Sequence, residues 1–92
     1  MDMGAWTEAG WSIDVDPTSV RVNGPTVSFE VDAAEAESTS LRWGLVGRRL
    51  CREGQPPQRI RRMPRGVATR LRASLSRVAL ESELRAWVGQ SV

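Results

Sequence analysis

Arginine is the residue whose type and spacing could do the most chemistry in this 92-residue chain. Residues 41–72 hold ten arginines and one glutamate, and the chain contains no lysine. A guanidinium group presents a planar fork of donors that pairs phosphates bidentately and stacks on bases. A flexible stretch of this composition suits RNA or single-stranded nucleic acid. The predicted phosphate contacts are Arg48, Arg49, Arg52, Arg59, Arg61, Arg62 and Arg65.

An ordinary solvated surface is the competing interpretation, because basic patches alone are weak evidence of nucleic-acid binding. Residues 1–40 carry eight acids and one arginine, whereas residues 41–92 carry twelve arginines and three glutamates, for net charges of −7 and +9. Either the acidic half folds against the basic half, or a basic face stays available to an anionic partner. The location of Asp14, Asp16, Glu30 and Glu35 relative to the arginines decides between the two.

The sequence contains no pattern typical of an enzyme or a metal site. Asp14 and Asp16 lie two residues apart and share one face of their segment, but that face lies opposite the apolar side chains and is more simply explained as solvent-facing. Cys51 is the single cysteine and the chain has no histidine, which excludes an internal disulfide, zinc-finger ligands and a histidine base. We expect a non-enzymatic protein with no cofactor and no metal.

The length of the chain predicts one small domain over residues 1–92. No apolar run approaches the roughly 18 residues of a membrane-spanning helix, and the N-terminal residues do not resemble a signal peptide. We expect an intracellular protein, cytoplasmic or nuclear, that does not enter a membrane.

Alternation of apolar and polar residues predicts a three-stranded antiparallel meander over residues 11–31. The segment 16–19 is typical of a turn, and Asn23-Gly24 offers the positive φ that a tight hairpin needs. Residues 1–10 are expected to be flexible. The apolar face of the predicted meander is formed by Trp11, Ile13, Val15, Val20, Val22, Val27, Phe29 and Val31.

The middle of the chain is predicted to be mostly irregular. Asp32 and Glu35 have the spacing of a capping box, which predicts a helix over residues 32–42. Residues 43–50 stay open between helix and strand, since two glycines disfavour a helix while alternating Leu and Trp favour a strand. The proline-rich and arginine-rich residues 53–66 predict a linker or an extended loop.

A C-terminal helix is predicted over residues 67–88, which no proline or glycine interrupts. Leu71, Leu75 and Val78 share one face, and Leu80, Leu84 and Trp87 share nearly the opposite face. Either the helix breaks near residues 79–82, or it is apolar on two sides. The second face supports an alternative function, a protein-interaction or regulatory module that binds a partner or forms a homodimer.

The overall prediction is an α+β fold in which the N-terminal meander packs on the C-terminal helix through a basic, irregular middle segment. Trp11, Trp43 and Trp87 are expected to anchor the core, because a small core needs large side chains.

A partial resemblance covers residues 31–50. The stretch VDAAEAESTSLRWGLVGRRLC resembles the opening of a plant-specific domain of unknown function, which is similar to the RNA-recognition-motif-like N-terminal module of LINE-type retroelement proteins. The resemblance implies nucleic-acid binding or a domesticated retroelement fragment, with residues 43–50 as the first strand of the module. No zinc knuckle follows, and a truncated or recently arisen small protein that keeps a piece of the module is the other interpretation.

Overall fold

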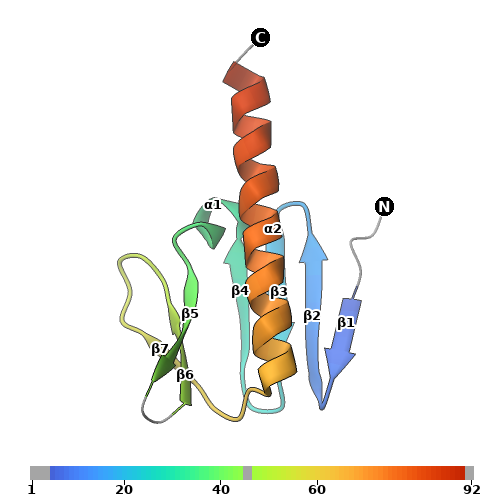
Figure 1. The fold of residues 1–92 in the computed structure, drawn as a ribbon, viewed down its shortest axis with the longest axis vertical. Coiled ribbons are helices and arrows are strands. Elements are labelled where there is room, and N and C mark those ends of the chain that lie inside the picture. Colours follow the sequence, from blue (N-terminus) through green and yellow to red (C-terminus); the bar gives the residue numbers. More distant parts are fainter. Residues whose placement is uncertain (1–4, 45–46, 91–92) are drawn as a thin grey trace.

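The computed structural model describes residues 5–44 and 47–90, which form an α+β domain. Two antiparallel sheets follow each other along the chain, and a long C-terminal helix packs across them (Figure 1). The predicted fold class is therefore confirmed. The predicted irregular middle segment is wrong, because residues 40–44, 47–51 and 58–60 form a second sheet.

The first sheet is a meander of four strands in the order of the sequence: β1 (Ala5–Glu8), β2 (Trp11–Asp16), β3 (Ser19–Asn23) and β4 (Ser28–Asp32). The three strands predicted over residues 11–31 are confirmed. The prediction that residues 1–10 are flexible is wrong for β1, which pairs with β2 so that Trp6 lies opposite Ile13. Residues 1–4 lie outside the described part of the chain. Strand β1 escaped prediction because its sequence, AWTE, does not alternate between apolar and polar residues.

The two turns of the meander depend on different properties of their residues. At the β2–β3 turn, one carboxylate oxygen of Asp16 accepts hydrogen bonds from the amides of Thr18 and Ser19 at 2.8 and 2.9 Å. At the β3–β4 turn, a Cβ on Gly24 would lie 2.6 Å from the buried indole ring of Trp11. Gly24 does not have the positive φ that was predicted, so a glycine is required there for space rather than for backbone freedom.

Helix α1 (Ala33–Ala36) is a single turn between the two sheets. The predicted helix over residues 32–42 is too long, since Ser40 already begins a strand. The predicted capping box does not form, because the side chain of Asp32 makes no capping hydrogen bond. Thr39 ends the turn by donating its hydroxyl to the carbonyl of Glu35 at 2.7 Å, which directs the chain into the second sheet.

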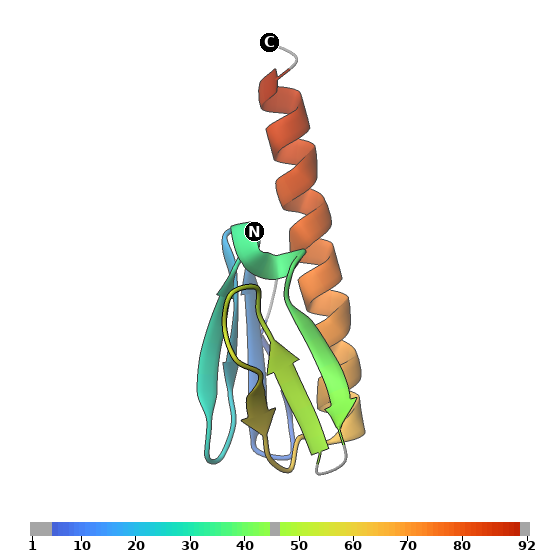
Figure 2. The ribbon, with the colours of Figure 1, turned by 90° about the vertical axis from the view of Figure 1, so that its left-hand side faces the viewer.

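The second sheet consists of β5 (Ser40–Gly44), β6 (Gly47–Cys51) and β7 (Gln58–Ile60), again antiparallel and in chain order. Residues 43–50, which the sequence left open, therefore form a hairpin whose residues 45–46 are not described. The predicted linker over residues 53–66 is wrong for residues 58–60, which pair with β6. In Figure 2 this sheet lies in front, with α2 on one side of it and the first sheet on the other.

Helix α2 (Arg65–Gln90) is continuous, so of the two alternatives left open by the sequence, the break near residues 79–82 does not occur. Its buried face includes Val67, Leu71 and Val78, each with no exposed surface, and it packs against the first sheet and β5. Leu41, Leu50 and Ile60 of the second sheet join the same apolar cluster. The C-terminal part of α2 extends beyond both sheets (Figures 1 and 2).

Candidate nucleic-acid interface

Three arginines lie side by side across the second sheet. In the strand register, Arg42 of β5 lies directly opposite Arg49 of β6, and Arg49 lies directly opposite Arg59 of β7. Directly opposite residues point to the same face of a sheet, with neighbouring strands about 4.8 Å apart. All three arginines are exposed. We call Arg42, Arg49 and Arg59 the arginine row.

The arginine row lies on the outer face of the sheet because the opposite face belongs to the core. Leu41, Leu50 and Ile60 alternate with the three arginines and are at most 5% exposed. The other described strand residues on the outer face are Ser40, Gly44, Gly47 and Cys51. Among these strand residues, none on the outer face carries a negative charge.

Trp43 and Arg48 form a cross-strand pair at the open end of the β5–β6 hairpin. Their side chains belong to the inner face, but Trp43 is 70% exposed because it lies beyond the core. The guanidinium of Arg48 lies 4.5 Å from the centre of the Trp43 ring, within the range of a cation–π contact. The expectation that Trp43 is a core residue is therefore wrong, whereas Trp11 is 2% exposed, as expected.

Arg48 is the most constrained of the predicted phosphate contacts. Its Nη1 donates a hydrogen bond to the carbonyl of Met63, which ties the hairpin to the start of α2. Partial burial lowers the pKa of Arg48 below its ordinary value, and the positive charges of Arg72 and Arg65 lower it further. Arg48, Arg65 and Arg72 therefore contribute to one local region of positive potential where the second sheet meets α2.

Three of the acidic residues in the N-terminal half are engaged on the first sheet. Asp14, Arg21 and Glu30 form a row of their own across β2, β3 and β4, and Arg21 forms an ion pair with Glu30 at 3.6 Å. Asp16 is engaged in the β2–β3 turn. Three of the four acids that could have neutralised the arginines therefore lie on the first sheet.

The pH dependence of stability is expected to report the role of Asp16. Hydrogen bonds from the Thr18 hydroxyl and amide and from Ser19 lower the pKa of Asp16 below its ordinary value of 3.8. The stabilisation is therefore fully present above about pH 4 and is lost as the pH falls through the lowered pKa. In thermal unfolding, Asp16→Ala is expected to lower the Tm at neutral pH. The difference from the wild type should shrink as the pH falls through the lowered pKa, because the protonated carboxyl keeps an acceptor oxygen but loses the charge.

The Asp16→Asn protein provides the matched control, because asparagine keeps one acceptor oxygen without the charge. Its Tm is expected to lie between those of the wild type and Asp16→Ala at neutral pH. A Tm difference between the wild type and Asp16→Ala that is as large at about pH 2 as at pH 7 would contradict the assignment.

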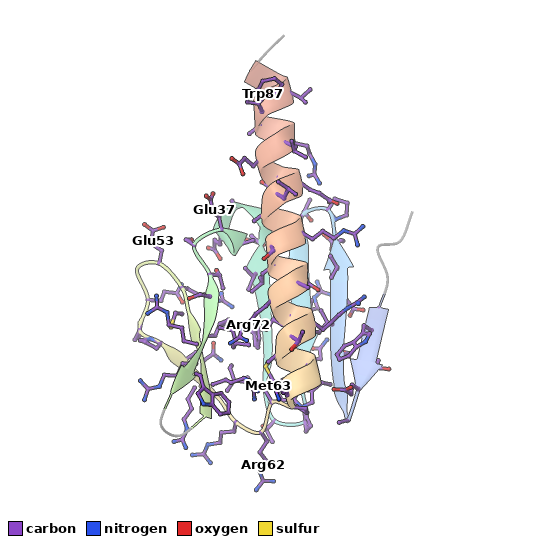
Figure 3. The ribbon with its side chains drawn as sticks, in the orientation of Figure 1. Glu37, Glu53, Arg62, Met63, Arg72 and Trp87 are labelled. Atoms are coloured by element: carbon purple, nitrogen blue, oxygen red, sulfur yellow. The ribbon has the colours of Figure 1, made fainter. Side chains whose placement is uncertain are left out.

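The remaining predicted arginines do not all join the arginine row. Arg52 lines a separate pocket of about 270 Å³ together with Glu35 and Glu53, so its charge lies among acids. Arg61 and Arg62 are exposed in the turn that follows β7, and Arg62 points away from the domain (Figure 3). Arg62 has a left-handed φ of 57°, which turns the chain so that Met63 enters the core. Arg65 is the exposed first residue of α2.

Arg42 is the residue that the sequence-based prediction missed. The alternation of Leu41, Trp43 and Leu45 indicated that residues 41–45 could form a strand with Arg42 on its polar side. The alternation placed Arg42 on the polar face of its own strand, but it gave no indication that Arg49 and Arg59 lie beside Arg42 on neighbouring strands.

Within residues 5–44 and 47–90, no group of three or more acidic or cysteine side chains is arranged to hold a metal ion. The helices described in this part of the chain include none that is long and apolar enough to cross a membrane.

The chain matches no protein-family model, no curated protein and no solved structure. The resemblance of residues 31–50 to the plant domain of unknown function stays a prediction. The expectation that residues 43–50 correspond to a single strand is wrong, since they contribute to two strands of a hairpin.

Proposed function

We propose that this protein binds single-stranded nucleic acid without catalysing a reaction, through the outer face of its second sheet. The observation that carries the proposal is the register of the arginine row, which places Arg42, Arg49 and Arg59 directly opposite one another on three adjacent strands. Arginines that are close in sequence can point in different directions and need not contact one ligand. Arginines that lie in register on one face of a sheet point the same way, so they act on the same ligand.

The energetics of the arginine row favour an anionic ligand. Like charges directly opposite one another destabilise a sheet by an amount comparable to the ~0.2–1 kcal/mol that favourable cross-strand pairs contribute. A phosphate bound between two guanidinium groups removes that repulsion and forms bidentate, charge-assisted hydrogen bonds with both. The second sheet is thus expected to be more stable with a bound polyanion than without one.

Trp43 supports single strands over duplexes as the ligand. An exposed indole stacks on a base only if the base is unpaired or splayed out of its helix. Trp43 lies at the end of the strand that carries Arg42, and Arg48 covers part of its ring. The end of the hairpin thus offers a stacking surface beside Arg48, on the face of the sheet opposite to the arginine row.

Separation of charge between the two sheets supports the same proposal. Asp14 and Glu30 lie beside Arg21, and Asp16 is engaged in the β2–β3 turn, so these three acids do not neutralise the positive field at the second sheet. A ligand approaching the second sheet meets this field before it meets the acidic row.

Fluorescence anisotropy with labelled single-stranded RNA, single-stranded DNA and a duplex of the same sequence tests the proposal. For about three to five phosphate contacts, binding of the single strands should weaken roughly 20- to 100-fold between about 50 and 200 mM salt. The duplex is expected to bind more weakly than either single strand. Absence of single-strand binding at the lower salt, or binding that does not change with salt, would show that the proposal is wrong.

A further inference from the structure

A second surface of the molecule has properties that differ from those of the arginine row. Leu80, Leu84, Trp87 and Val88 are between 54% and 67% exposed on the part of α2 that extends beyond the sheets. At 100° per residue these four side chains fall within about 100° of arc and form one stripe. We call them the apolar stripe. Trp87, like Trp43, is therefore not the core residue that the sequence predicted.

A groove lies directly beside the apolar stripe. It has a volume of about 510 Å³ between α2, α1 and β5, and its apolar lining comes from Ala36, Leu41, Leu75 and Ala79. Leu80 belongs to both the groove and the stripe. Glu37 and Glu83 also line the groove, and Glu37 lies beside α2 in Figure 3, with Trp87 further along the helix.

We propose that the apolar stripe binds a second copy of this chain, with the two α2 helices antiparallel and Trp87 of each copy in the groove of the other. If Leu80 lies opposite Leu84 of the second copy, the two-fold axis also places Leu84 opposite Leu80 of that copy. Trp87 then lies at the level of residues 75–79 of the second copy, which is where the groove opens. The register that pairs Leu80 with Leu84 of the second copy therefore also brings Trp87 to the groove of that copy.

The shape of the domain permits this arrangement. The groove ends near Glu83, and the helix continues beyond it for residues 84–90, a length of about 10 Å. In the antiparallel register, the two domains lie at opposite ends of the helix pair, so the tail of each α2 reaches the groove of the other copy. A parallel arrangement would place the two basic second sheets near each other at the same end.

Charge favours a second copy as the occupant. Between residues 77 and 90, α2 carries Arg77, Glu81, Glu83 and Arg85, which sum to zero. Arg77 and Arg85 each lie within 4.0 Å of Glu81 on the same helix. Two copies therefore approach along this segment without net repulsion, in contrast to the basic second sheet. The carboxylates of Glu37 and Glu83 supply acceptors for the indole N–H of an inserted Trp87.

The area of the apolar stripe and groove is close to the lower end of the range for specific homodimers. The exposed fractions of the four stripe side chains correspond to an apolar patch on the order of 400 Å² per copy, within the range of the largest, often functional patches on monomeric proteins. Two such patches, together with the walls of both grooves, approach the roughly 1,200 Å² at the lower end of specific interfaces. A tryptophan inserted into a pocket at the centre of an interface is the typical dominant contact.

Sedimentation velocity with the full chain, from about 1 to 500 µM protein, tests the proposal. The wild type is expected to shift from monomer to dimer over this range. Trp87→Ser and Leu84→Gln should each weaken dimer formation by at least ~30-fold. The matched control is Trp43→Ser, which removes an equally exposed tryptophan from the hairpin and should leave the dimer unchanged. Circular dichroism spectra should match for all four proteins, because none of the substituted side chains is buried.

Three outcomes would overturn the proposal: a wild type that stays monomeric at the highest concentration, a dimer that survives both stripe substitutions, or a dimer that Trp43→Ser abolishes. About 500 mM salt should leave the dimer intact, since its contacts are apolar, whereas nucleic-acid binding at the arginine row should be lost. The same salt titration therefore distinguishes failure of this inference from failure of the proposed function.

Discussion

Replacing Arg42, Arg49 and Arg59 together by glutamine is expected to weaken binding of single-stranded RNA by about 100-fold at ~50 mM salt. Glutamine keeps hydrogen-bonding capacity and approximate size but removes the charge that pairs with phosphate. Because three phosphate contacts are lost, the slope of log affinity against log salt concentration should also fall by about 2. Anisotropy titrations of the wild type and the triple variant at several salt concentrations measure both quantities.

The chain offers a matched control for this triple variant. Arg21, Arg77 and Arg85 each lie within 4.0 Å of a glutamate and lie on β3 or α2 rather than on the second sheet. Replacing these three by glutamine changes the net charge by the same amount and should reduce the affinity less than about 5-fold. Equal losses in the two triple variants would mean that net charge, and not the arginine row, determines binding.

Leu71→Ala is expected to reduce the free energy of unfolding by about 3 kcal/mol, whereas Leu84→Ala should change it by less than about 0.5 kcal/mol in the monomer. Both substitutions make the same chemical change on the same helix. Leu71 has no exposed surface and lies in the shared core, so its removal leaves a cavity. Leu84 is 54% exposed on the apolar stripe. Urea unfolding followed by circular dichroism gives both values.

Repeating the urea unfolding at several protein concentrations distinguishes the role of α2 in the core of one copy from its role in contact with a second copy. If the apolar stripe holds a dimer, any loss of stability in Leu84→Ala should grow as the protein concentration rises, because dissociation is linked to unfolding. The loss in Leu71→Ala arises mainly inside one copy and should be present at every concentration. A similar, concentration-independent loss in both variants would mean that the C-terminal part of α2 packs on its own domain.

Strands β2, β3 and β4 of the first sheet and both faces of α2 could be predicted from the sequence because their signals are local. Ile13, Val20, Val22 and Val31 alternate with polar residues, and turn-forming residues separate the strands. The buried Leu71 and the exposed Leu84 were separated by helical periodicity alone. In each case the period of one continuous segment decides which side chains point inward.

The second sheet could not be predicted, because its strands have weak local signals. Glycines interrupt the β5–β6 hairpin, and β7 has only three residues in a proline-rich and arginine-rich segment. Such a segment has the composition of a loop, and only pairing with β6 makes it a strand. Trp43 was misplaced for a related reason, since its residue type favours the core whereas the end of the hairpin lies beyond the core.

The sequence by itself determined that the chain carries an acidic half, an arginine-rich half, a meander and a helix with two apolar faces. Only the tertiary structure decided that Arg42, Arg49 and Arg59 lie in one row, that the acids pair elsewhere, and that the apolar stripe lies beside a groove. The physical reason is that alternation fixes which face of its own strand a side chain takes. Register between strands, and the packing of a helix on a sheet, depend on contacts between residues far apart in the chain.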